Sequence, residues 1–232
     1  MDNGYLYTVI GKEHREEAVA SMKRLRQVDP SAHITIVTTS PIDGFDRCIV
    51  KQQSRPELGG IGYKAEHLTN EYYERTFYVD SDVYFVEDCK LLFTRVFAEF
   101  DMALMPDPAE IEIDFGLVPY NTGIVLMNRN KAVTETLKLF RDYYFDEHCR
   151  NRVLKNHPAQ KQITDQPNFM QAIRDTRVKV LPLPSNYNFR YRFAVSINGK
   201  AKIIHGPVPE MGWEALVQKI NANTEARIWT RP

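Results

Sequence analysis

The chain has 232 residues, of which 43% are hydrophobic and 26% are charged, an ordinary soluble composition with enough apolar residues for a sizeable core. Its formal net charge is zero, which argues against an electrostatic grip on nucleic acid or on an anionic membrane. No apolar run approaches the ~20 residues that cross a bilayer, and the N-terminus lacks the basic and apolar regions of a signal peptide.

Strand and helix patterns alternate from the start of the chain. An amphipathic helix at 14–28, with Ala18, Met22 and Leu25 on its apolar face, separates β-prone runs at 5–10 and 34–38. Strand–helix–strand order predicts a βαβ unit, in which the strands pair in parallel and the crossover is right-handed.

The alternation continues to the C-terminus. A glycine-rich turn is expected at 59–62, and a long, acidic, Pro-punctuated surface loop at 106–120. Further helices are expected at 63–73, at 131–145, after a cap at Thr164, and at 213–221. Further strands are expected at 47–50, 77–79, 101–105, 121–128, 178–181, 186–193 and 202–205. No repeat or linker interrupts this order, so we predict a single α/β domain over residues 1–232, with a mostly parallel central sheet flanked by helices.

Cysteine usage bears on the compartment. Cys48, Cys89 and Cys149 are widely spaced and odd in number, which favours reduced thiols and a cytoplasmic location. Because the chain has no Cys-x-x-Cys pair, a structural zinc site is not expected.

Two carboxylates, Asp80 and Asp82, follow the apolar strand at 77–79, and apolar residues resume at Val83. An unpaired buried carboxylate is very costly, so both are expected at the carboxyl end of a sheet, where open α/β folds bind ligands. Neighbouring carboxylates repel each other unless a cation lies between them or one is protonated. A divalent metal carrying a phosphate-bearing ligand would remove that repulsion. Taken alone, such a pair is more often a solvated turn, and it is the context that favours a site.

Two further residues could extend such a site. His205 ends the strand at 202–205 and is either bonded to the backbone or a third metal ligand. Mixed oxygen and nitrogen ligation would suit Mn2+, with Mg2+ possible. Lys64 lies on the helix that precedes the Asp80 strand, and it is either a solvated lysine or part of an anion site at a helix start.

Three other segments have two interpretations each. Asp165 and Gln166 begin a helix, where they are either plain capping residues or a hydrogen-bonding pair for sugar hydroxyls. Asn121-Thr122-Gly123 is either a turn or a backbone-exposed ligand contact. The aromatic stretch at 187–193 is more often core than a platform for a sugar.

Together these segments resemble the glycosyltransferases of family 8, a group with a Rossmann-like GT-A domain that includes glycogenin and bacterial galactosyl- and glucosyltransferases. The resemblance covers about Tyr5 to Trp213 and rests on these segments, in chain order: Lys64 before the strand Phe77 to Asp82, then Asn121-Thr122-Gly123, Asp165-Gln166, Leu181-Pro-Leu-Pro-Ser-Asn-Tyr187-Asn188 and Ile203-Ile204-His205-Gly206. One departure stands out. In family members, a lysine shortly after the histidine usually touches the diphosphate. The segment from Pro207 to Trp213 contains no lysine.

The resemblance implies metal-dependent transfer of a sugar, with retention, from a UDP-sugar to a carbohydrate, protein or lipid-linked acceptor. It implies that Mn2+ (or Mg2+) is held by Asp80, Asp82 and His205, and that Lys64, Asp165 and Gln166 carry the catalytic roles. Lys64 would also contact the donor, and the other donor contacts implied are Thr8, Val9, Ile10, Ser81, Asn121, Gly123 and Gly206. The loop at 106–120 and the stretch at 187–192 would contact the acceptor.

Two other functions are compatible with the residues. An apolar strand ending in Asp-x-Asp also resembles the nucleophile strand of haloacid-dehalogenase-type phosphatases, in which Asp80 would be phosphorylated and Asp82 would act as acid and base. That strand normally opens its domain, whereas about 75 residues precede it here. The second alternative is a nucleotide-sugar-binding protein with weak or no transferase activity, which the missing lysine favours.

Overall fold

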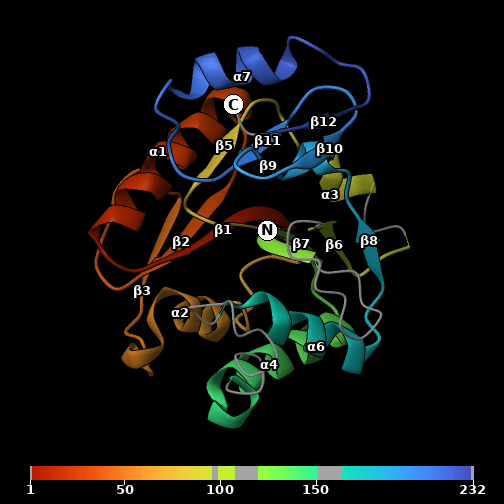
Figure 1. The fold of residues 1–232 in the computed structure, drawn as a ribbon. Coiled ribbons are helices and arrows are strands. Elements are labelled where there is room, and N and C mark those ends of the chain that lie inside the picture. The colour runs from red at the N-terminus through yellow and green to blue at the C-terminus, as the bar shows by residue number, and fades with distance from the viewer. Residues whose placement is uncertain (1, 96–98, 108–119, 151–163, 231–232) are drawn as a thin grey trace.

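A seven-stranded sheet forms the centre of the computed structural model, which describes residues 2–95, 99–107, 120–150 and 164–230 (Figure 1). Its strands lie in the order β3 (Arg47–Val50), β2 (Ile34–Thr38), β1 (Asn3–Val9), β4 (Arg75–Val79), β7 (Tyr120–Asn128), β6 (Met102–Pro106) and β8 (Val180–Pro182). The pairs β3–β2, β2–β1, β1–β4 and β6–β8 are parallel, and only β7 runs antiparallel to both of its neighbours. The predicted mostly parallel sheet is therefore confirmed, including the βαβ unit.

Helices cover both faces of this sheet because its strands alternate buried side chains between two cores. Tyr5 and Tyr7 pack on one face with Ala18, Met22 and Leu25 of α1 (Lys12–Val28), the helical face that the sequence predicts. Leu6 and its neighbours pack on the opposite face. That face is covered by α2 (Gly59–His67), α4 (Lys131–Phe145) and α6 (Gln166–Thr176) (Figure 1).

A smaller β layer is built mostly from the C-terminal part of the chain. Strands β5 (Val83–Phe85), β11 (Ile203–His205) and β9 (Phe189–Arg190) form one sheet, and β10 (Val195–Ile197) pairs with β12 (Arg227–Trp229). Helix α7 (Trp213–Asn221) packs onto this layer around Phe189, Ile204 and Trp229 (Figure 1). Short helical turns complete the described elements: η1 (Pro56–Leu58), α3 (Leu92–Arg95) and η4 (Ser185–Tyr187). The chain passes from the central sheet to the small one between β4 and β5, through Asp80, Ser81 and Asp82.

Two helix boundaries differ from the prediction. Residues 59–62 are the first turn of α2 rather than a separate turn, and α2 ends at His67 instead of Tyr73. It ends there because the hydroxyl of Thr69 bonds the Glu66 carbonyl and the amide of Asn70 bonds the His67 carbonyl, which competes with further helical bonds. At α6, Thr164 is not the cap: the N-cap position falls on Asp165, whose side chain makes no capping hydrogen bond.

The predicted half-exposed strand at 186–193 is mostly wrong. Only Phe189–Arg190 is strand, preceded by the turn η4 and followed by a further turn. Polar and aromatic residues alternate there because Phe189 and Tyr191 enter the core, while the intervening arginines point elsewhere. The loop expected at 106–120 lies outside the described residues except for Pro106, Asp107 and Tyr120. Among the described helices, none is long and apolar enough to cross a membrane.

Candidate functional site

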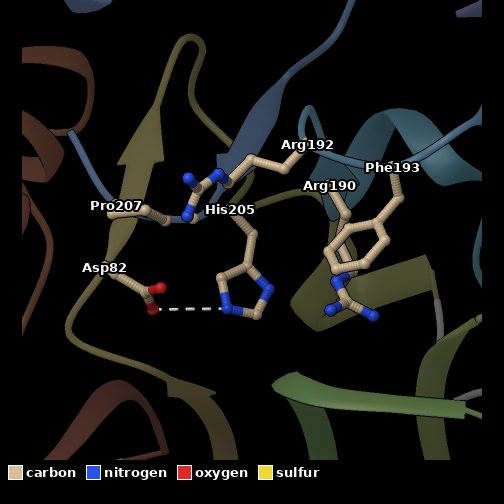
Figure 2. A pocket seen from close by; sticks show the side chains of 7 residues that line it. Asp82, Arg190, Arg192, Phe193, His205 and Pro207 are labelled. Atoms are coloured by element: carbon tan, nitrogen blue, oxygen red, sulfur yellow. Dashed lines mark ion pairs between the residues drawn. The ribbon is translucent and has the colours of Figure 1, made fainter. Parts of the chain in front are cut away.

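Asp80, Asp82 and His205 meet where the two sheets join. Asp80 follows β4, Asp82 precedes β5, and His205 ends β11, which pairs with β5 so that His205 lies beside Val83. His205 Nε2 lies 3.2 Å from Asp82 Oδ1 (Figure 2) and 4.0 Å from Asp80 Oδ2. One ligand atom from each of the three residues falls within 4.8 Å of the others. The fold thus brings three separate segments of the chain to one point.

The donor set and its spacing fit a divalent metal. An octahedral Mg2+ with bonds of about 2.1 Å holds adjacent ligand atoms about 3 Å apart, and Mn2+ needs slightly more. The distance of 3.2 Å between His205 and Asp82 matches an adjacent pair. Two carboxylates and one imidazole are also ligands that Mn2+ accepts. These residues could therefore hold a metal without large rearrangement.

Backbone contacts hold this cluster in place. The amide of Asp80 donates to the Gly123 carbonyl at 2.8 Å, and the amide of Gly206 donates to the Asp82 carbonyl at 3.0 Å. The His205 ring lies directly over Gly123, where a Cβ atom would fall 2.7 Å from Nδ1 and 2.8 Å from Nε2. Position 123 therefore needs glycine because the ring approaches the bare backbone, not because of a positive φ.

Lys64 lies at the base of the cluster and is only 5% exposed. Its ammonium lies 2.9 Å from Asp165 Oδ2 and 3.1 Å from Asp80 Oδ1, and it donates to the Thr122 carbonyl at 2.7 Å. Burial by itself lowers the pKa of Lys64, but the charges of Asp165 and Asp80 raise it by more, so the net pKa is well above its usual range. Lys64 is thus a permanent buried cation rather than a solvated surface lysine.

Asp165 and Asp82 both have pKa values below their usual range. Burial raises the pKa of Asp165, but the charge of Lys64 and hydrogen bonds from Lys64 and Thr122 outweigh it. Burial also raises the pKa of Asp82, and the hydrogen bond and charge of His205 reverse that effect. With Asp80, the site holds three carboxylates against one lysine, an excess of negative charge that a divalent cation would neutralise.

A cavity of about 330 Å³ opens beside the triad (Figure 2). Its lining consists of Asp82, Arg190, Arg192, Phe193, His205, Gly206 and Pro207. Arg190 pairs with the buried Asp107, and its guanidinium lies 4.0 Å from the centre of the Phe193 ring. Within the described part of the chain, Arg192 is exposed and has no hydrogen bond or ion pair. It is therefore a free cation at the wall of the cavity.

The remaining predicted donor residues take different positions. Thr8 contacts the Tyr78 hydroxyl at 3.4 Å, which in turn donates to Asp80 Oδ1 at 2.6 Å. Val9 is buried in the core on one face of the sheet, and Ile10 packs partly against the core on the other face. The hydroxyl of Ser81 donates to Glu17 of α1 at 2.9 Å and is already engaged there.

Asn121 and Gln166 are both buried. The Asn121 side chain is used inside the protein, where its Oδ1 accepts the Gly123 amide. Gln166 begins α6 next to Asp165. Asp165 is not a plain capping residue, because its carboxylate accepts from Thr122 Oγ1 at 2.7 Å and pairs with Lys64.

Sequence reasoning missed four site residues: Asp107, Asn188, Arg190 and Arg192. None is predicted individually, but all four lie in segments for which the sequence predicts acceptor contacts, Asp107 in the loop at 106–120 and the other three at 187–192. The available signal was the polar–aromatic alternation at 186–193, but the register of β9 against β11, which places Arg190 beside His205, cannot be read from it.

Comparison with solved structures identifies the fold as that of GT-A glycosyltransferases. The apo form of the glycosyltransferase GlyE from Streptococcus pneumoniae TIGR4 is 14% identical with a TM-score of 0.59, over 98% of this chain and 58% of that one. In a second GlyE structure the match spans 48% of that chain, so this chain covers about half of the GlyE proteins. Mouse xyloside xylosyltransferase 1 is 12% identical with a TM-score of 0.57, over 90% of this chain and 100% of that one.

The galactosyltransferase LgtC is also similar. An active-site mutant of LgtC is 14% identical to this chain with a TM-score of 0.56, over 90% of this chain and 88% of that one. Another LgtC structure holds donor and acceptor sugar analogs. Searches against protein-family models and curated proteins found no match. At such low identities the likeness defines the fold of this chain.

Proposed function

We propose that this chain is a metal-dependent glycosyltransferase that moves a hexose from a UDP-sugar to a carbohydrate, protein or lipid-linked acceptor, with retention at the anomeric carbon. The observation that carries the proposal is the convergence of Asp80, Asp82 and His205 beside a cavity that Arg190 and Arg192 also line. The GT-A fold of the neighbours supports it. We further propose that residues 1–232 act as one catalytic domain, because the three ligands come from both sheets.

Each charged group has a defined task in this proposal. A bound Mn2+ or Mg2+, held by Asp80, Asp82 and His205, would supply charge that stabilises the diphosphate as it leaves. Lys64 holds Asp80 and Asp165 in place, and its charge lowers the pKa of Asp165. Asp165 and Gln166, at the start of α6, would hold the sugar. We assign no nucleophile.

Arg192 would take over the diphosphate contact of the missing lysine. Pro207 lines the same cavity as Arg192, and the segment from Pro207 to Trp213 contains no lysine. In Figure 2 the Arg192 side chain runs past His205 in the direction of Pro207. A guanidinium can bind two phosphate oxygens at once, which an ammonium cannot do with the same geometry.

The proposal is tested by thermal-shift measurements with a panel of nucleotide sugars, with and without Mn2+. A ligand that binds only the folded protein at 100 times its Kd stabilises it by about 2.7 kcal/mol. For a chain of this size we expect a rise in melting temperature of roughly 5–10 °C, for one UDP-sugar and only with metal. Asp82→Ala should abolish the rise, whereas the control Asp142→Ala, an exposed carboxylate on α4, should keep it.

Other results would favour the alternatives. Absence of any metal-dependent stabilisation by UDP-sugars would contradict the proposal. Tight UDP binding without turnover across a panel of acceptors would favour a nucleotide-sugar-binding protein. Release of phosphate from a generic phosphomonoester would favour the phosphatase, for which the fold comparisons offer no support.

A further inference from the structure

We propose that Asn188 is a positioning residue that holds a proton of the His205 ring on Nδ1, so that Nε2 is the ring nitrogen left for the metal. The inference rests on the proposed metal site. Asn188 precedes β9, and its side-chain oxygen lies 3.0 Å from His205 Nδ1, on the opposite side of the ring from Asp82. An oxygen of an amide can only accept a hydrogen bond, so this contact requires a proton on Nδ1.

The orientation of the Asn188 amide follows from a donor whose identity is certain. The backbone N–H of Gly123 can only donate, and it lies 2.9 Å from the side-chain oxygen of Asn121. The NH2 group of Asn121 therefore points toward the Asp107 carboxylate and lies 3.4 Å from its Oδ2. Because an NH2 group can only donate, it needs an acceptor of this kind. The orientation of Asn121 is therefore determined by two independent partners.

The next link is the contact between the two asparagines. The Asn121 oxygen lies 2.8 Å from a terminal atom of the Asn188 amide, which must be the NH2 group because two oxygens there would repel each other. The oxygen of Asn188 then faces His205 Nδ1. A flip of either amide would bring two acceptors together, either between the two asparagines or at the Asp107 carboxylate.

Burial makes this chain of bonds decisive. Asp107, Asn121 and Asn188 are 1%, 4% and 0% exposed, so water cannot easily replace a lost partner. A buried polar group without a partner is costly, and each amide flip would set two acceptors or two donors against each other. The far end of the chain is stabilised by the pair between Asp107 and Arg190. The network therefore keeps a proton on Nδ1 of His205, so that Nε2, which faces Asp82 Oδ1 at 3.2 Å, is the ring nitrogen that remains for the metal.

The proton on Nδ1 has a direct consequence for metal binding. Hydrogen bonds of this kind to the second ring nitrogen of a ligating histidine orient the ring and raise its basicity, and their removal typically weakens metal affinity roughly 10–100-fold. The contact also holds the ring over Gly123, next to Asp80 and Asp82. We expect the same order of effect when Asn188 loses its acceptor.

The first test measures the affinity for Mn2+ alone by isothermal titration calorimetry. Asn188→Leu keeps a similar volume without an acceptor, and its Mn2+ affinity should fall about 10–100-fold. Asn188→Asp retains an oxygen for Nδ1–H and should keep more of the affinity than Asn188→Leu. The control is Asn186→Ala, since Asn186 lies two residues away and its NH2 group bonds the Asn198 carbonyl instead. Wild-type affinity in a folded Asn188→Leu variant, or equal losses in both Asn188 variants, would overturn the proposal.

The second test needs no variant at position 188 and so does not depend on its folding. Long-range 1H–15N spectra of the metal-free protein, at a pH where histidine is neutral, distinguish the two tautomers directly. We expect a proton on Nδ1 for the signal that disappears in His205→Gln, whereas Nε2, which faces Asp82 Oδ1 at 3.2 Å, can share a proton with that carboxylate until the metal replaces it. A ring without a proton on Nδ1 would overturn the proposal. Because the spectra involve no nucleotide sugar, a failure of transferase activity would leave this result readable.

Discussion

Lys64 occupies an environment in which lysine is rare. Its ammonium is enclosed by Asp80, Asp165 and the Thr122 carbonyl, and it lies 4.7 Å from the centre of the Tyr78 ring. Desolvating a charge is costly unless its partners are well placed, and removing one member of a buried pair is worse than keeping it. At this site Lys64 therefore acts first as the counter-ion of two carboxylates.

This placement predicts a large effect of Lys64→Met on stability. The variant keeps most of the side-chain volume but leaves Asp80 and Asp165 without their cation, so we expect a loss of about 3–5 kcal/mol at pH 7. Urea unfolding would measure it. The control Lys131→Met removes a lysine whose side chain is 90% exposed, and its effect should stay within about 0.5 kcal/mol. Equal midpoints for wild type and Lys64→Met would contradict the pairing.

The pH dependence of the same pair has a defined sign. The pKa of Asp165 is lowered in the folded state, so its contribution to the free energy of unfolding is present above its unfolded value of about 3.9 and is lost as the pH falls through the lower folded value. The pKa of Lys64 is raised, so its contribution is lost only as the pH rises through that value. The difference in unfolding free energy between wild type and Lys64→Met should therefore shrink at acidic pH. A difference that grows on acidification, in urea series at pH 7 and pH 3, would contradict this.

Gly123 is the second residue on which the geometry of the site depends, because its lack of a side chain leaves room for the His205 ring. Gly123→Ala would place a methyl group against the His205 ring and push it out of position. Because a metal ligand would be misplaced, we expect the Mn2+ affinity to fall at least about tenfold. We also expect the free energy of unfolding to fall by about 1–3 kcal/mol. Gly60→Ala is the matched control because its Cβ would meet only Ile10, at 3.9 Å. Calorimetric Mn2+ affinities that are the same for both variants would contradict the role of Gly123.

At the scale of elements, the short strand β9 brings cationic side chains to the metal site. Its pairing with β11 sets Arg190 beside His205, and the chain then turns so that Arg192 also lines the cavity. Phe189 and Tyr191, which alternate with them, are buried in the core of the C-terminal layer. Packing of the aromatic residues therefore determines where the guanidinium groups lie.

This arrangement predicts that Arg192→Ala weakens binding of UDP but not of uridine. A hydrogen bond to a charged group contributes about 1.5–3 kcal/mol, so the affinity for UDP in the presence of Mn2+ should fall by roughly 10–100-fold. Uridine lacks the diphosphate and should bind equally to both proteins. Arg174→Ala, which removes a surface arginine paired with Asp175 on α6, serves as the control. Parallel losses for UDP and uridine in calorimetry would show that Arg192 does not recognise the diphosphate.

At the scale of the whole molecule, the candidate metal position lies where two sheets join, one face of the small sheet sharing the core of the central sheet through Val83, Phe85 and Ile203. Asp80 follows β4 of the central sheet, whereas Asp82 directly precedes β5 and His205 ends β11, two strands of the small sheet formed by β5, β11 and β9. The small layer has its own core around Phe189, Ile204 and Trp229. A metal bound to all three residues would therefore link the two layers of the protein.

We predict from this that Mn2+ reduces amide hydrogen exchange mainly in the small layer. Binding to the native state raises the free energy of any opening that breaks the site. Protection should increase in β5, β9 and β11, and change little in β2 and β3 at the far edge of the central sheet. Mass spectrometry of exchange with Mn2+ and with EDTA would measure it. A uniform change over the chain, or none, would contradict a metal that links the layers.

The sequence alone determined the features that depend on local periodicity. The buried face of α1, the bounds of α4 and α7 and the parallel βαβ unit all follow from patterns within a few turns of chain. The cost of burying charge was enough to place Asp80 and Asp82 at a strand end. The convergence of His205 on them agrees with the predicted metal set, although the metal itself stays a prediction.

Only the tertiary structure decided the environment of those residues. Lys64 is a buried counter-ion because β7 brings Thr122 beside Asp80 and α6 brings Asp165 to the same place. The hydrogen bonds from Asn121 through Asn188 to His205 join residues that are 67 and 17 positions apart. No local pattern encodes such contacts, because they depend on strand order and register, which are set by how the whole chain buries its apolar surface.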